Sequence, residues 1–159
     1  MKASIDQCHH NLVIANGILA RLNDSHLAFE PQPGAKTAGW LIGHLAVTGD
    51  FARRLCGAEP LCPREWRATF NPGSRPSNDA ADYPAMNVLG ETFRSVYTDL
   101  CAVAPTADPA LLSIPNPFEP ARDEFATAGD FVAYLMSSHL AYHVGQLSGW
   151  CAAAGIARD

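Results

Sequence analysis

Residues 128–154 read AGDFVAYLMSSHLAYHVGQLSGWCAAA, a run of 27 positions that contains no proline. Apolar side chains recur in it every three or four positions, at Met136, Leu140, Val144 and Leu147. That spacing places them on one face of an α-helix. The stretch therefore predicts the longest helix of the chain, ending at Gly155, where glycine can take the left-handed conformation that closes helices.

Three earlier stretches have the same spacing and predict helices over residues 4–23, 37–56 and 85–103. Thr37 can cap the second of these helices, and Gly57 can end it. Proline and glycine are frequent between the helices, above all over residues 58–84 and 104–127. We therefore expect an all-α fold, a four-helix bundle with long second and third connections, in which at least one neighbouring pair is parallel.

Composition limits both the architecture and the partners. The 159 residues are 48% apolar and 17% charged, with a formal charge of −5, which predicts one globular domain over residues 1–159. The sequence contains no run of Lys or Arg, so we expect no nucleic-acid partner. No segment approaches the roughly 20 apolar residues that cross a bilayer, so we expect no membrane partner. Five widely spaced cysteines without a CxxC pair predict a reduced, cytoplasmic chain in which they act as small buried residues.

Three histidines form the main candidate site. His139 and His143 are four positions apart on the predicted fourth helix, so their rings share one face. His44 lies on the inward stripe of the predicted second helix and can face them across the core. Three neutral imidazoles suit a transition metal such as Zn, Ni, Fe or Co, and they leave coordination positions open for water or substrate. The alternative is three core histidines that are hydrogen-bonded independently.

A few neighbours are candidates for the surroundings of such a site. Gln146 and Thr48 each lie about one turn from a candidate histidine, where they can bond an imidazole or a bound water. Trp40 can line the pocket, together with Trp150, Phe51 and Phe131. Asp50 is turned away from His44 around the helix, so no general base and no catalytic residue can be assigned.

Two segments together are similar to the DinB/YfiT-like superfamily: GWLIGHLAVTGDFARRLCG over residues 39–57 and FATAGDFVAYLMSSHLAYHVGQLSGWCAAAGI over residues 125–156. The resemblance implies a four-helix bundle with a divalent metal on His44, His139 and His143, and it favours a homodimer. Members often carry an arginine after the GQ element, whereas here LSGW follows Gln146. That contact to an anionic substrate is therefore not carried over.

The resemblance also implies a function. Some members are metal-dependent transferases or isomerases that use a low-molecular-weight thiol, such as bacillithiol or mycothiol, as cosubstrate. We expect a divalent metal (Zn, Ni or Fe), a small-molecule substrate that is an electrophile, and a thiol S-transferase or isomerase activity. Two alternatives stay open at this point, a metal-dependent hydrolase and a non-catalytic metal- or ligand-binding stress protein.

Overall fold

The computed structural model describes residues 1–156 and has the expected all-α fold. The long helices are α1 (Lys2–Leu19), α2 (Ala38–Leu55) and α4 (Met86–Val103), followed by a run of α6 (Ala128–Tyr134), a π-helical turn (Leu135–His139) and α7 (Leu140–Ala153). Within residues 1–156 the only β pairing is an isolated bridge between Pro115 and Thr127. No helix among them is long and apolar enough to span a bilayer.

The helix ends follow from local chemistry. The Thr37 hydroxyl accepts the backbone N–H of Trp40 at 3.2 Å and so starts α2 as predicted, and Gly57 follows the helix with a φ of +90°. The predicted first helix over residues 4–23 is wrong at its end, because α1 stops at Leu19. Beyond it, Asn23 caps a short 3₁₀-helix (Asp24–His26), which competes with continuation of α1.

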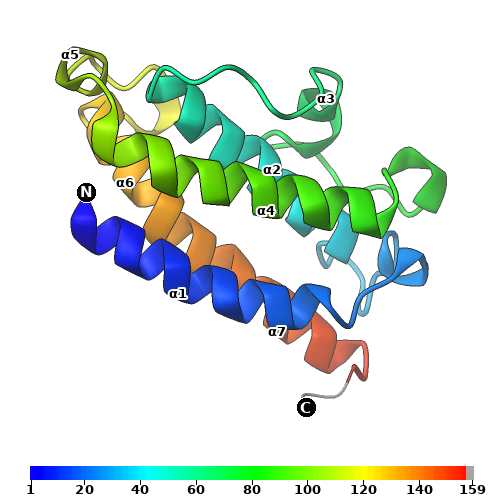
Figure 1. Ribbon diagram of the computed structural model, residues 1–159. Helices are drawn as coiled ribbons and strands as arrows, with labels where there is room; N and C mark the ends of the chain where they lie inside the picture. Colours follow the sequence, from blue (N-terminus) through cyan, green and yellow to red (C-terminus); the bar gives the residue numbers. More distant parts are fainter. Residues whose placement is uncertain (157–159) are drawn as a thin grey trace.

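The long helices pack so that α2 contacts α4 and the α6–α7 run, while α1 contacts α4 and α7. Near the start of α2, Thr37 is hydrogen-bonded to Tyr83, just before α4, and near its end Arg53 pairs with Asp99 of α4. These contacts show that α2 and α4 run in the same direction. Figure 1 shows a second parallel pair, α1 beside the α6–α7 run. The expected parallel neighbours are therefore present.

The fourth helical run departs from the uninterrupted α-helix predicted over residues 128–154. Its residues Leu135–His139 form a π-helical turn. Inside this turn the Ser137 hydroxyl donates to the Ala133 carbonyl at 2.5 Å, and the Asn11 amide of α1 donates to the Ser137 carbonyl at 3.5 Å. Such side-chain bonds compete with the regular ladder, and π turns occur often at functional sites. Here the turn ends at one of the candidate metal ligands.

The long second connection is ordered over the bundle rather than loose. It contains the short helix α3 (Trp66–Phe70) and a 3₁₀-helix (Ala80–Asp82), and both ends of α3 are buried. The Phe70 ring lies against Gly43 of α2, where a Cβ would overlap it. The third connection contains α5 (Pro109–Leu112) and two 3₁₀-helices (Ala104–Thr106 and Glu119–Ala121).

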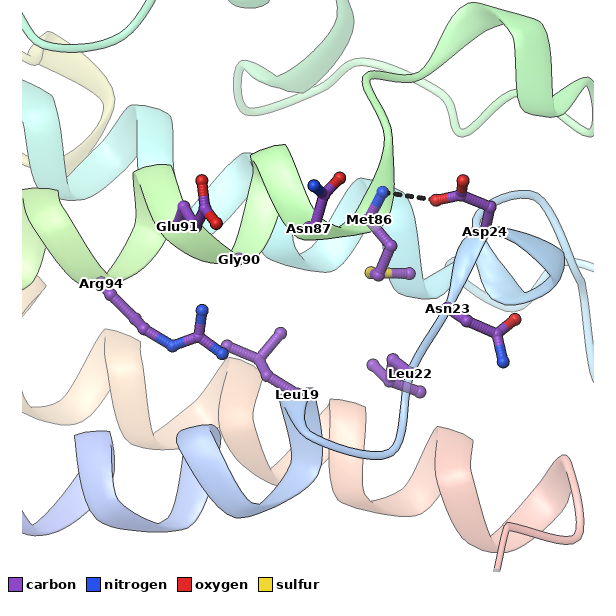
Figure 2. A pocket seen from close by; sticks show the side chains of 9 residues that line it. All are labelled: Leu19, Leu22, Asn23, Asp24, Met86, Asn87, Gly90, Glu91 and Arg94. Carbon is purple, nitrogen blue, oxygen red and sulfur yellow. Dashed lines mark hydrogen bonds between the residues drawn. The ribbon is translucent and has the colours of Figure 1, made fainter.

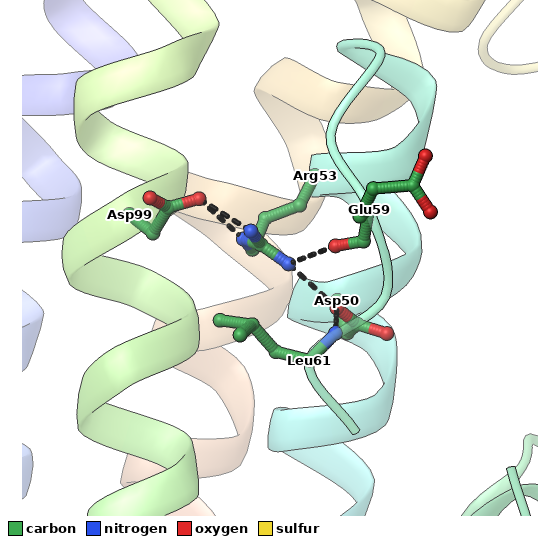
Figure 3. A network of polar contacts seen from close by, with 5 residues as sticks. All are labelled: Asp50, Arg53, Glu59, Leu61 and Asp99. Carbon is green, nitrogen blue, oxygen red and sulfur yellow. Dashed lines mark hydrogen bonds and ion pairs between the residues drawn. The ribbon is translucent and has the colours of Figure 1, made fainter. Parts of the chain in front are cut away.

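A buried arginine ties the second connection to the helices (Figure 3). Arg53 pairs with Asp50 at 2.9 Å and with Asp99 at 2.5 Å, and it also donates to the Glu59 carbonyl at 2.9 Å. Asp50 in turn accepts the backbone N–H of Leu61 at 2.9 Å. Asp50, which the sequence predicted to be turned away from His44, thus belongs to this network.

Gly49 allows the close approach of α2 and α4. A Cβ at this position would lie 2.8 Å from Val96 Cγ1 and 2.9 Å from Tyr97 Cε2. We expect Gly49→Ala to lower the free energy of unfolding by about 1–3 kcal/mol, the usual cost of overpacking a core. Gly17→Ala is the matched control, because its new Cβ meets no atom within 4 Å and should stabilise α1 by roughly 0.5–1 kcal/mol. Urea unfolding of both variants checks this, and a neutral Gly49→Ala would contradict it.

Candidate metal centre

The structure brings the three predicted histidines together. His44 comes from α2, His139 from the end of the π turn and His143 from α7. The Nε2 atoms of His44 and His139 are 3.3 Å apart, and one ligating nitrogen from each of the three rings lies within 4.8 Å of the others. His44 and His143 are buried, and His139 is half-buried.

Hydrogen bonds hold two of the rings in the tautomer that suits a metal. His44 Nδ1–H donates to the Phe70 carbonyl at 2.8 Å, and His143 Nδ1–H donates to Gln146 Oε1 at 2.7 Å. Each ring therefore keeps its lone pair on Nε2. Ligating histidines commonly donate their second ring nitrogen in this way, which fixes the ring and raises its basicity. Gln146 thus lies where the sequence predicted an imidazole partner.

The spacing of the nitrogens fits a bound divalent ion. Two imidazole nitrogens, each about 2.0–2.1 Å from a tetrahedral zinc, are about 3.3 Å apart, which is the separation of the His44 and His139 Nε2 atoms. His139 Nδ1 is buried and has no hydrogen-bond partner among the described residues.

The electrostatics of the cluster keep the rings neutral. Burial lowers the pKa of His44 to about 4, and it lowers the pKa of His139 to about 3 with the help of the neighbouring imidazoles. The pKa of His143 is also lowered, mainly by burial. Neutral imidazole is the form that binds a metal ion. At neutral pH all three rings are therefore ready to act as ligands.

Two further predicted residues take different places. The Trp40 ring stacks on His44, with centroids 4.6 Å apart and planes 9° from parallel, and its indole N–H donates to Ser74 Oγ at 2.9 Å. It lines the centre as predicted. Thr48 donates instead to the His44 carbonyl at 2.8 Å, within its own helix. Its hydroxyl is thus used by the backbone rather than by an imidazole nitrogen.

A row of aromatic side chains in mutual contact begins at His139. Tyr134 lies edge-on to His139 at 5.6 Å between centroids, and Phe131 stacks on Tyr134 at 6.0 Å and meets Phe51 at 6.2 Å. Trp150, which the sequence grouped with them, lies elsewhere and donates to the Phe29 carbonyl. The apolar wall is therefore made by Tyr134, Phe131 and Phe51.

Sequence reasoning missed the Phe70 carbonyl, the contact that orients His44. A backbone acceptor on the second connection leaves no mark of its own in the sequence. The indirect signal is Gly43, since a glycine inside a helix often marks the close approach of another segment. Sequence reasoning also missed Lys36, whose Nζ lies 3.8 Å from the centroid of the Trp40 ring.

A large cavity of about 460 Å³ lies apart from this centre, between the end of α1 and the start of α4 (Figure 2). Leu19 and Met86 form part of its apolar floor, and Glu91 and Arg94 stand at its side. Asp24 at its edge accepts the backbone N–H of Met86 at 2.7 Å and so caps α4. None of the three histidines lines this cavity.

One of the comparisons with known proteins gave a match. The family model described as the DinB superfamily matches residues 7–147, which include all three histidines. Comparisons with curated proteins and with solved structures gave no match. The all-α arrangement and the three-histidine cluster fit that match, and the cluster can hold a divalent metal. The chain belongs to the DinB superfamily.

Proposed function

We propose that His44, His139 and His143 hold a divalent transition metal and that the protein is a metal-dependent thiol S-transferase or isomerase. The observation that carries the proposal is the set of three neutral imidazoles with converging nitrogens, two of which are fixed by Nδ1–H donors. Such a set leaves open coordination positions, as catalytic sites do. A metal there would supply a Lewis acid that favours the thiolate form of a bound thiol.

The residues around the cluster suit this chemistry better than hydrolysis. Among residues 1–156, no carboxylate contributes to the pKa shifts of the three histidines, so none of these carboxylates is assigned as a general base. A thiol needs none once its proton has passed to solvent. Its sulfur then forms a bond to the electrophilic carbon, and the leaving group departs with the electron pair of the broken bond. The wall of Tyr134, Phe131 and Phe51 would receive the apolar electrophile.

Thiol conjugation by the zinc-loaded protein tests this proposal. With bacillithiol or mycothiol and a chloromethyl electrophile, we expect conjugate to form at least tenfold faster than without protein. We expect this excess rate to disappear after chelation and in His139→Ala. His10→Ala is the matched control, because His10 is exposed on α1. Conjugation that survives metal removal would contradict the proposal.

Other outcomes favour the alternatives over thiol transfer. A product that takes its oxygen from labelled water would identify a metal-dependent hydrolase. Tight metal binding without turnover of any thiol or electrophile would identify a binding protein.

A further inference from the structure

The candidate metal centre has a cation, Lys36, beside it. Lys36 Nζ lies 3.8 Å from the centroid of the Trp40 ring, and that ring stacks on His44 at 4.6 Å. The Lys36 charge helps to lower the pKa of both His44 and His143. A divalent metal on three neutral imidazoles would add two further positive charges. The centre therefore calls for a negatively charged ligand.

Lys36 has no carboxylate partner among residues 1–156. The ion pairs of the described chain join other residues, and the one hydrogen bond of Lys36 Nζ is a long contact of 3.4 Å to the Ser74 carbonyl. An ammonium has three N–H donors. At least two of these donors are therefore left for solvent or for a ligand.

We infer that Lys36 recognises a carboxylate on the molecule that binds at the three-histidine centre, so that the cosubstrate is a thiol acid. This inference rests on the proposed thiol function and names the class of thiol. Lys36 would give the site an anion contact just before α2, whereas LSGW rather than an arginine directly follows the GQ element of the fourth helix.

Lys36 and His44 both contact the Trp40 indole, the ammonium at 3.8 Å from the ring centroid and the His44 ring at 4.6 Å between centroids. A ligand held by the histidines and by Lys36 would therefore reach past this one indole. A short thiol acid is the first ligand to test.

A pair of probes of matched size tests the inference. Cobalt-loaded protein is titrated with 3-mercaptopropionate and with 3-mercaptopropanol, and the cobalt absorption spectrum reports binding. We expect the wild type to prefer the acid by about tenfold, which corresponds to about 1.4 kcal/mol, because hydrogen bonds to charged groups are stronger than those between neutral groups. Lys36→Met should lose this preference and bind the alcohol as the wild type does. Lys36→Arg should keep most of it.

Lys2→Met is the matched control, since Lys2 is an exposed lysine of α1 that pairs with Asp6. Equal affinity of the wild type for both probes, or an unchanged preference in Lys36→Met, would overturn the inference while the thiol function stands. If neither thiol binds, the thiol function fails. Titration of the same protein with propionate and with propanol then tests the role of Lys36 separately. A carboxylate affinity that Lys36→Met leaves unchanged, or no binding of propionate, would refute its role.

Discussion

Alanine at position 44, 139 or 143 is expected to reduce the metal content from about one ion per chain to near zero. The three nitrogens converge on one point, so each substitution removes one of three protein ligands. Loss of even an outer partner of a ligand costs about 10–100-fold in affinity, and loss of a ligand should cost more. Elemental analysis of untagged protein after dialysis measures the effect. In a thermal unfolding assay, the stabilisation of about 2.7 kcal/mol that a metal gives at 100 times its Kd should also disappear.

His10→Ala and His9→Ala serve as controls, because both residues are exposed on α1 and outside the cluster. His44→Asn complements His44→Ala, since its amide nitrogen takes the place of Nδ1 and can still donate to the Phe70 carbonyl. Circular dichroism of each metal-free variant separates loss of metal from loss of fold. A wild-type protein that is folded and takes up no Zn, Ni or Fe would show that these are core histidines.

Arg53→Met is expected to lower the free energy of unfolding by about 3–5 kcal/mol, the usual cost of removing one partner of a buried ion pair. The Asp50 side chain is only 4% exposed and would lose its cationic partner, keeping only the backbone N–H of Leu61. The Glu59 carbonyl would also lose its donor. For a domain of this size, each kcal/mol shifts Tm by about 2–4 °C, so Tm should fall by roughly 6–20 °C.

Asp99→Asn is the control for the exposed half of the same network. Asp99 is 41% exposed, and water screens such pairs, so its loss should cost less than about 1 kcal/mol. The double variant Arg53→Met with Asp50→Asn should recover part of the loss, because it removes the unpaired charge. Equal effects of Arg53→Met and Asp99→Asn would contradict the importance of the buried pair.

The helices were predictable because their signals are local. An apolar stripe, a capping threonine at position 37 and a glycine at position 57 act within a few residues, and the structure places α2 accordingly. The metal cluster was predictable for a related reason. Helix periodicity alone sets which residues of one helix share a face, and the resemblance supplied the pairing of His44 with the fourth helix.

The rest depends on segments far apart in the chain. The π turn depends on Ser137 and on the Asn11 amide of α1, and the tautomer of His44 depends on the backbone of Phe70. Lys36 reaches the centre only through its packing on Trp40. None of these contacts is encoded in a local pattern. The expected homodimer and the small-molecule partner stay predictions.

The parallel pairing of α2 with α4 and of α1 with α7 has a consequence for biosynthesis. His44 and His139 are separated by 95 positions, and chains emerge from the ribosome with the N-terminal half first. A nascent chain that has exposed α1, α2 and α4 already buries their common interfaces but holds only one of the three imidazoles. The complete set of three imidazoles arises only when the last helical run docks, so the cluster cannot form before residues 139–143 have been synthesised.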